Sequence, residues 1–177
     1  KMATPIQTMT TSAQKTSTEI RSRPLGYYVE QYGDLIFDLC ESVLWSPTNA
    51  QIAFFQVLKA LEKHRSAGAF YEVYERAWVL GLTVERLKRL SARLGRRLSP
   101  SEQVMLDASL PVTQRLVKFD SYFHRLMPDD QILLILRDKY GLPYTEISAA
   151  IGLPEGSLKI RRQQALATLE VWLWDRR

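Results

Sequence analysis

Six polar side chains near the end of the chain have the chemistry needed to read or hold DNA. Lysine and arginine suit guanine edges or phosphates, glutamine suits adenine, and glutamate can accept a hydrogen bond from cytosine. A helix with such residues near its N-terminus fits the major groove. We therefore expect DNA contacts from one run of residues: Glu155, Ser157, Lys159, Arg161, Arg162 and Gln163. The alternative interpretation is a solvated charged face.

The other side chains with reactive chemistry are not arranged as a site. His64 and His124 lie far apart in the sequence, and with the single cysteine, Cys40, they offer no zinc ligand set. Cys40 falls in an apolar helical pattern, which predicts a buried structural thiol in a reducing compartment. The position of Asp129 and Asp130 is explained by the start of a helix, because carboxylates are stabilising near a helix N-terminus. With no Gly-rich phosphate loop and no nucleophile elbow, we expect no catalysis, no metal and no cofactor.

A helix and a tight turn precede the candidate DNA-binding run. Gly152 supplies the backbone freedom that a short turn requires, and Pro154 is tolerated at the start of a helix. Apolar residues around the turn are placed to fill the space between two helices: Ile147, Ile151, Leu153 and Leu158. This spacing predicts a helix-turn-helix over 142–165, with a plain αα-hairpin as the alternative.

The rest of the ordered chain has the apolar spacing of helices. One helix is expected from Pro24 to Trp45, a second from Ser46-Pro47 to Gly68, and a third from Ala69 to about Leu94. The second has a wide apolar face, which is typical of a helix packed on two sides. Ser99 to Glu102 forms a capping box that starts a further short helix.

These elements predict an all-α fold of two small helical domains joined by a partly helical linker. Met127-Pro128-Asp129-Asp130 starts the first helix of the second domain, and Tyr140-Gly141 stops it. The expected division is a disordered tail over 1–23, an N-terminal helical domain over 24–95, a linker over 96–126 and a C-terminal helix-turn-helix domain over 127–177.

The positive charge of the chain is concentrated in its middle. The net charge is +5, and between Thr83 and Ser99 basic side chains far outnumber the single acid, Glu85, whereas the segment before it is net acidic. A basic strip of this kind can bind along the phosphate backbone of DNA, with an affinity that falls as the salt concentration rises. Its candidate contacts are Arg86, Lys88 and Arg89.

The sequence contains no apolar run near the ~20 residues that span a bilayer. Its start also lacks the apolar core of a signal peptide. We therefore expect a cytoplasmic protein without membrane insertion.

Three motifs together resemble the small two-domain bacterial RNA polymerase sigma factors of the extracytoplasmic-function (ECF) group in the sigma-70 family. The run from Leu126 to Arg161 is similar to the promoter-reading domain of these factors, region 4. Tyr32-Gly33-Asp34-Leu35 resembles part of their opening helix in region 2. Arg76-Ala77-Trp78 is similar to the start of their promoter-melting helix. The resemblance spans about residues 24–173.

The resemblance implies a transcription initiation factor that binds core RNA polymerase and directs it to specific promoters. The implied partners are double-stranded promoter DNA, core RNA polymerase and an anti-sigma factor. In this interpretation the aromatic ring of Trp78 stacks on an unpaired promoter base, which is typically worth ~1–3 kcal/mol. The alternative, which we prefer, places Trp78 in the core.

One segment departs from the pattern of the ECF group. The family carries carboxylates that bind the polymerase clamp, but the aligned segment from Ala50 to Gln56 has none. The candidate polymerase contacts there are Gln51, Phe55 and Gln56. This departure keeps open a sigma-derived DNA-binding regulator or adaptor that no longer recruits polymerase in the standard way. A helical protein-interaction module that binds no DNA is the third hypothesis.

Overall fold

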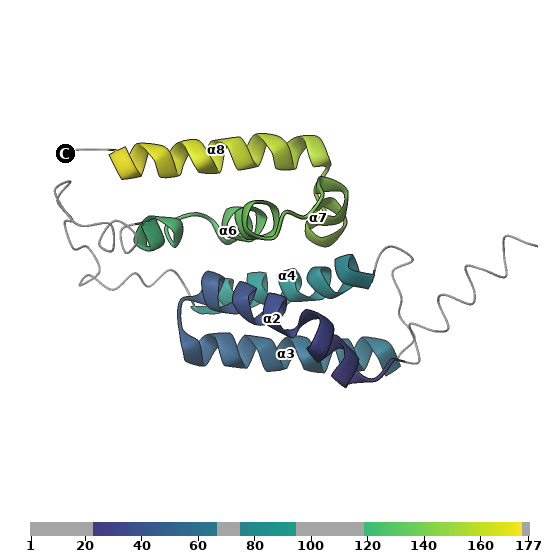
Figure 1. Ribbon diagram of the computed structural model, residues 1–177. Coiled ribbons are helices and arrows are strands. Elements are labelled where there is room, and N and C mark those ends of the chain that lie inside the picture. The colour runs from purple at the N-terminus through teal and green to yellow at the C-terminus, as the bar shows by residue number, and fades with distance from the viewer. Residues whose placement is uncertain (1–22, 67–74, 95–118, 175–177) are drawn as a thin grey trace, which may run out of the picture.

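The structure, a computed structural model, describes residues 23–66, 75–94 and 119–174. All regular elements in these ranges are helical (Figure 1), which confirms the all-α prediction. The elements are α2 (Leu25–Leu44), α3 (Pro47–Ser66), α4 (Glu75–Leu94), α6 (Pro128–Leu134), η2 (Ile135–Lys139), α7 (Tyr144–Ile151) and α8 (Glu155–Trp174).

The sharp turn between α2 and α3 follows from local residue chemistry. Trp45 adopts a left-handed conformation with φ of 46°, and its N–H donates to the carbonyl of Glu41 at 3.0 Å, which ends α2. Ser46 Oγ then accepts from the N–H of Asn49 at 3.3 Å, and Pro47 occupies the first helical position. The predicted helix start at Ser46-Pro47 is therefore confirmed.

The helix that begins at Pro128 ends at Lys139 with Tyr140 as its cap, which agrees with the predicted stop at Tyr140-Gly141, but its last turn is wider than an α-helix. In η2 the N–H of Tyr140 donates to the carbonyl of Ile135 at 3.1 Å, five residues back. The N–H of Leu142 then donates to the carbonyl of Leu136 at 3.0 Å. In this wider turn Ile135 and Leu136 are both buried.

Several predicted features lie outside the described residues. They include most of the tail over 1–23, the start of the third helix before Glu75, the capping box at Ser99 and the linker up to residue 118. Arg23, the last residue of the predicted tail, is described, and its guanidinium pairs with Glu75 of α4. Residues 119–123 are helical and lie within the linker that the sequence predicted to be partly helical.

The helices are stacked in layers. Figure 1 shows α8 on one outer side, then α6 and α7, then α4 and α2, with α3 on the opposite outer side. A small cluster of Leu126, Leu134, Ala165 and Leu169 holds α8 against α6. The candidate DNA-binding helix α8 and the candidate polymerase-binding helix α3 therefore lie at opposite ends of the stack.

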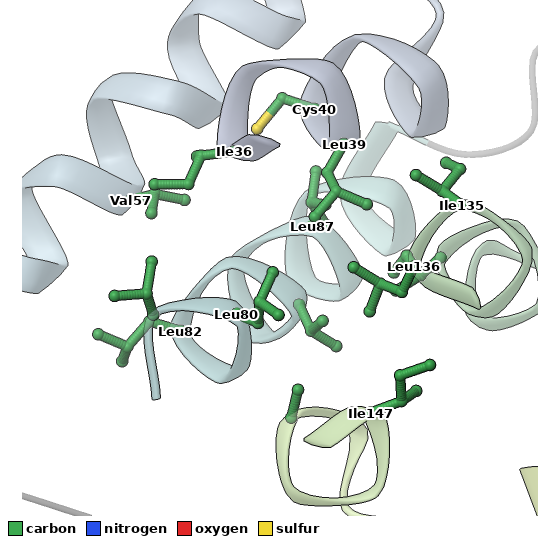
Figure 2. Close-up of a cluster of buried hydrophobic side chains, with 14 of the residues drawn as sticks. Ile36, Leu39, Cys40, Val57, Leu80, Leu82, Leu87, Ile135, Leu136 and Ile147 are labelled. Carbon is green, nitrogen blue, oxygen red and sulfur yellow. The ribbon is translucent and has the colours of Figure 1, made fainter. Parts of the chain in front are cut away.

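Helix α4 lies at the centre of the main core. Every residue from Ala77 to Val84 except Gly81 is buried, because α2 and α3 cover one side of α4 while α6 and α7 cover the other. Figure 2 shows side chains of both predicted domains in this core: Leu39, Leu80, Leu87, Leu136 and Ile147. The two predicted domains share one hydrophobic core, and their boundaries remain a prediction.

Cys40 has the buried position that its helical pattern indicated. Its side chain is fully buried on α2, and burial raises the pKa of the thiol to about 12. Since the thiolate is the reactive form, we expect native protein at pH 8 to resist alkylation by iodoacetamide and to react after unfolding in urea. Mass spectrometry measures the modified fraction. A Gln51→Cys variant, exposed on α3, is the positive control, and rapid labelling of native wild-type protein would contradict the prediction.

Candidate nucleic-acid interface

The predicted helix-turn-helix is present in α7 and α8. α7 ends at Gly152, whose φ of +79° allows its N–H to donate to the carbonyl of Ser148 at 2.9 Å. The hydroxyl of Ser148 donates to the carbonyl of Leu153 at 2.7 Å and closes the turn. Ile147 and Leu158, both fully buried, fill the space between the helices. This local chemistry fixes the angle at which α8 leaves the turn.

The candidate DNA-binding residues all lie in the first half of α8, but they differ in exposure. Leu158 and Ala165 face inward, which leaves Ser157, Lys159 and Gln163 exposed. The Lys159 ammonium lies 5.5 Å from the centroid of the Tyr144 ring on α7. These exposed side chains form a polar surface on the outer layer of the molecule.

The two arginines of the run are engaged by carboxylates of the same chain. Arg161 pairs with Asp130, and its Nη1 lies 3.6 Å from Oδ2 of Asp129. Arg162 Nε lies 2.9 and 3.0 Å from the two oxygens of Asp138, and these hydrogen bonds raise the pKa of the Arg162 guanidinium. To contact DNA, both guanidinium groups must exchange a carboxylate for a phosphate or a base.

This pairing corrects the interpretation of the carboxylates in α6. A helix N-terminus alone was expected to explain Asp129 and Asp130, and both do lie in the first turn of α6. Their side chains also reach α8 through Arg161, and Asp129 Oδ1 lies 3.1 Å from the ammonium of Lys88 on α4. Sequence spacing gave no sign of these contacts, because the partners are far apart along the chain.

The candidate DNA contacts on α4 are less accessible than the sequence suggested. Trp78 is 5% exposed, with its ring edge-on to Tyr28 at 5.8 Å between centroids, so it is a core residue in this structure and cannot stack on a base. This corrects the candidate stacking role. Lys88 pairs with Asp129, Arg89 pairs with Glu85 one turn earlier, and Arg86 is half-buried.

The candidate polymerase-binding residues lie on the outer side of α3. Gln51 and Phe55 are exposed and Gln56 is half-buried. Phe55 has 67% of its surface exposed, and the neighbouring Ile52 has 46%. The wide apolar face of α3 had predicted a helix packed on two sides, and that expectation is wrong for these two side chains. Their exposure, together with the lack of charge from Pro47 to Leu58, makes this an uncharged and partly apolar surface.

Within 23–66, 75–94 and 119–174, no group of three His, Cys, Asp or Glu side chains could hold a metal ion. None of the helices in these ranges is both long enough and apolar enough to cross a membrane.

The family comparison decides the identity of the helix-turn-helix. Residues 116–169 match the model of "Sigma-70, region 4", which covers α6, η2, α7 and most of α8. The C-terminal part of the chain is a sigma-70 region 4 domain. The match includes Glu155 to Gln163, so the candidate DNA-binding run lies within the segment that matches region 4.

A solved structure with the same fold extends the comparison beyond region 4. It is the co-crystal structure of the sigma factor RpoE in complex with the anti-sigma factor NepR from Bartonella quintana. The similarity has a TM-score of 0.63 at 18% identity and covers 86% of this chain and 98% of the other. No curated protein sequence matches the chain. The region 4 match confirms the predicted resemblance to sigma-70 factors, and the shared fold agrees with it.

Proposed function

We propose that this chain is a transcription initiation factor of sigma type, which binds core RNA polymerase and directs it to specific promoters. The observation that carries the proposal is the region 4 match over a helix-turn-helix whose second helix exposes Ser157, Lys159 and Gln163. In such a factor the role of the chain is to bind and position. We propose no catalytic step and no cofactor, and we place the protein in the cytoplasm with the polymerase.

The promoter duplex would be bound by α8. Its first turns enter the major groove, where Lys159 reaches a guanine edge or a phosphate and Gln163 reaches an adenine. Glu155 and Ser157 lie nearest the start of the helix and complete the surface. Arg161 then exchanges its carboxylate partners for DNA phosphates, as does Arg162, which makes binding strongly dependent on salt.

The polymerase would be bound by the outer side of α3. Gln51 and Gln56 offer amide hydrogen bonds, and Phe55 offers an apolar side chain that a partner can bury. Exposed aromatic side chains of this kind often dominate the affinity of an interface. This surface differs chemically from the acidic one of the ECF group, because its contacts are uncharged.

An anti-sigma factor is the third proposed partner. The RpoE structure with the same fold was solved in complex with the anti-sigma factor NepR. We propose that a protein of this class binds the present chain and withholds it from polymerase or promoter.

Reconstitution with core RNA polymerase tests the proposed function. We expect a stable complex on size-exclusion chromatography and a promoter-dependent transcript from genomic fragments of the source organism. Phe55→Ala should weaken the complex roughly 5- to 30-fold, a loss of about 1–2 kcal/mol, because it removes the most exposed apolar side chain of α3.

The matched control is Lys63→Ala, an exposed change on the same helix that should leave the complex unchanged. A complex without any transcript would refute the proposed role in initiation, whereas the sigma-derived regulator or adaptor predicts that no standard complex forms. The absence of both complex and transcript, with duplex binding retained, would refute polymerase recruitment altogether.

A further inference from the structure

We infer that two copies of this chain pair through the outer face of α8, in antiparallel orientation, and that the resulting dimer cannot bind a DNA duplex through that helix. The pairing follows from the shape and charge of α8 alone, whereas its effect on promoter binding rests on the proposed function. A second copy of the chain and DNA therefore compete for the same helix.

The outer face of α8 carries a regular seam of exposed residues. The members of the seam alternate in steps of three and four residues, which is the spacing of the contact positions in a coiled coil. Leu158, Ala165 and Leu169 hold another face of α8 against the rest of the molecule, and α8 forms one outer side of the stack (Figure 1). Every member of the seam is exposed: Ser157, Ile160, Gln164, Ala167, Val171 and Trp174. A second helix can therefore pack along the length of α8.

The seam is complementary to itself when the two copies run in opposite directions. With the two-fold axis at the midpoint of the seam, Ile160 faces the partner's Val171, which makes an apolar contact. Gln164 then faces the partner's Ala167, whose short side chain leaves room for the amide. Each of these contacts occurs twice, as the self-complementary interface of a two-fold dimer requires.

The same register gives a burial site to the last residue of the seam. Trp174 is 72% exposed, the largest fraction among the large apolar side chains that the structure describes. Antiparallel pairing places it opposite the partner's Ser157. In each copy Ser157 lines a hollow of about 530 Å³, to which Leu126 and Met127 contribute apolar surface. The indole ring can therefore be buried against the other copy, and buried tryptophans often dominate the affinity of an interface.

Charge also favours the antiparallel orientation. Lys159, Gln163 and Glu170 lie on one flank of the seam, and all three are exposed. Antiparallel pairing brings the partner's Glu170 to a level between Lys159 and Gln163, where its carboxylate can accept hydrogen bonds from the ammonium and the amide. In a parallel pair Glu170 would lie level with the partner's Glu170, so the carboxylate would gain no basic neighbour from α8.

Pairing covers the surface of α8 that would contact a promoter. Ser157 belongs both to the seam and to the candidate DNA-binding run, and the partner's Glu170 engages Lys159 and Gln163 of the same run. The major groove is wide enough for one α-helix, so a helix that is already paired along its length cannot enter it. The dimer is therefore a form of the protein that withholds α8 from DNA.

Sedimentation velocity over a wide range of protein concentration tests the pairing. We expect wild-type protein to shift from monomer to dimer with a Kd on the order of 10 μM, because one pair of helices makes a small interface. Trp174→Gln leaves the charge unchanged and should raise this Kd at least ~10-fold. Leu94→Gln, an exposed change at the end of α4, is the matched control and should leave the Kd unchanged.

Wild-type protein that stays monomeric at every concentration would overturn the inference and would leave the seam to a different partner. A dimer that Trp174→Gln and Leu94→Gln affect equally would overturn it as well, because the contact would then lie elsewhere on the molecule.

Disulfide cross-linking tests the orientation. A mixture of Ile160→Cys chains with tagged Val171→Cys chains should form a mixed dimer under mild oxidation, because these positions face each other in the antiparallel register. Ile160→Cys alone should not cross-link, since its two copies lie towards opposite ends of the seam. Lys59→Cys, exposed on α3, measures background cross-linking, and Cys40 is buried. Efficient cross-linking of Ile160→Cys alone would show a parallel pair and refute the antiparallel register.

Titration with a random DNA duplex at low salt tests the competition, because phosphate contacts alone give non-specific binding. The apparent duplex affinity of wild-type protein should fall as the dimer fraction rises, to roughly one fifth when a fifth of the chains remain monomeric, whereas that of Trp174→Gln should stay constant. A wild-type dimer that binds the duplex as tightly as the monomer would refute the competition. A dimer that forms as expected from a chain that neither binds DNA nor supports transcription would instead refute the proposed function and leave the pairing in place.

Discussion

Leu80→Ala is expected to lower the free energy of unfolding by about 2–5 kcal/mol. Leu80 is fully buried on α4, and Figure 2 shows it within the cluster that joins both halves of the chain. Truncating its isobutyl side chain to a methyl group leaves a cavity between helices packed on two sides of α4. Urea titration followed by far-UV circular dichroism measures the change.

The shared core also predicts how many transitions the protein shows when it unfolds. Because α4 contacts α2 and α3 on one side and α6 and α7 on the other, both halves should unfold in one transition. Circular dichroism and tryptophan fluorescence should therefore give coincident curves for the wild-type protein. Two separated transitions would show that the halves are independently stable and would contradict the single core.

A matched control lies on the same helix. Leu94, the last residue of α4, is 42% exposed. Leu94→Ala removes the same group from a position that solvent already reaches, and its effect should stay within about 0.5 kcal/mol. A comparable loss in both variants would mean that helix propensity, and not burial, determines the stability of α4.

Lys159→Ala is expected to reduce the affinity of the protein for its promoter duplex roughly 5- to 150-fold, which corresponds to about 1–3 kcal/mol for one groove contact. Lys159 is exposed in the first turns of α8, where a helix in the major groove makes its base contacts. Fluorescence anisotropy with a labelled promoter fragment measures the affinity at several salt concentrations.

Lys63→Ala is the control for the change in charge. It also removes one exposed lysine, but from α3 at the opposite end of the stack (Figure 1), so duplex affinity should change little. Equal losses in the two variants would indicate non-specific attraction by net charge. If Lys159 contacts a phosphate, its loss should weaken binding to promoter and random duplexes alike. The slope of log affinity against log salt concentration should then become shallower by about 0.9. If it contacts a base, the loss should be greater for the promoter.

Local sequence determined the helices, their ends and the turn that places α8. Ser46-Pro47, Pro128 and Gly152 act on their own backbone or on residues within one turn, so their effect can be read without the rest of the fold. The region 4 motif is equally local, since its apolar residues and its basic run all lie within residues 116–169. The predicted fold class and DNA-binding element followed from this information.

Only the tertiary structure decided how these elements cover and pair with one another. Arg161 and Arg162 looked free for DNA in the sequence, but Asp130 and Asp138 lie beside them, 31 and 24 residues earlier in the chain. The wide apolar face of α3 predicted packing on two sides, but Phe55 is exposed; for Trp78 the sequence left core and base stacking open, and the structure buries it. Helical periodicity shows that a helix has an apolar face and cannot show which element covers it, because burial and ion pairing depend on contacts between segments far apart in sequence.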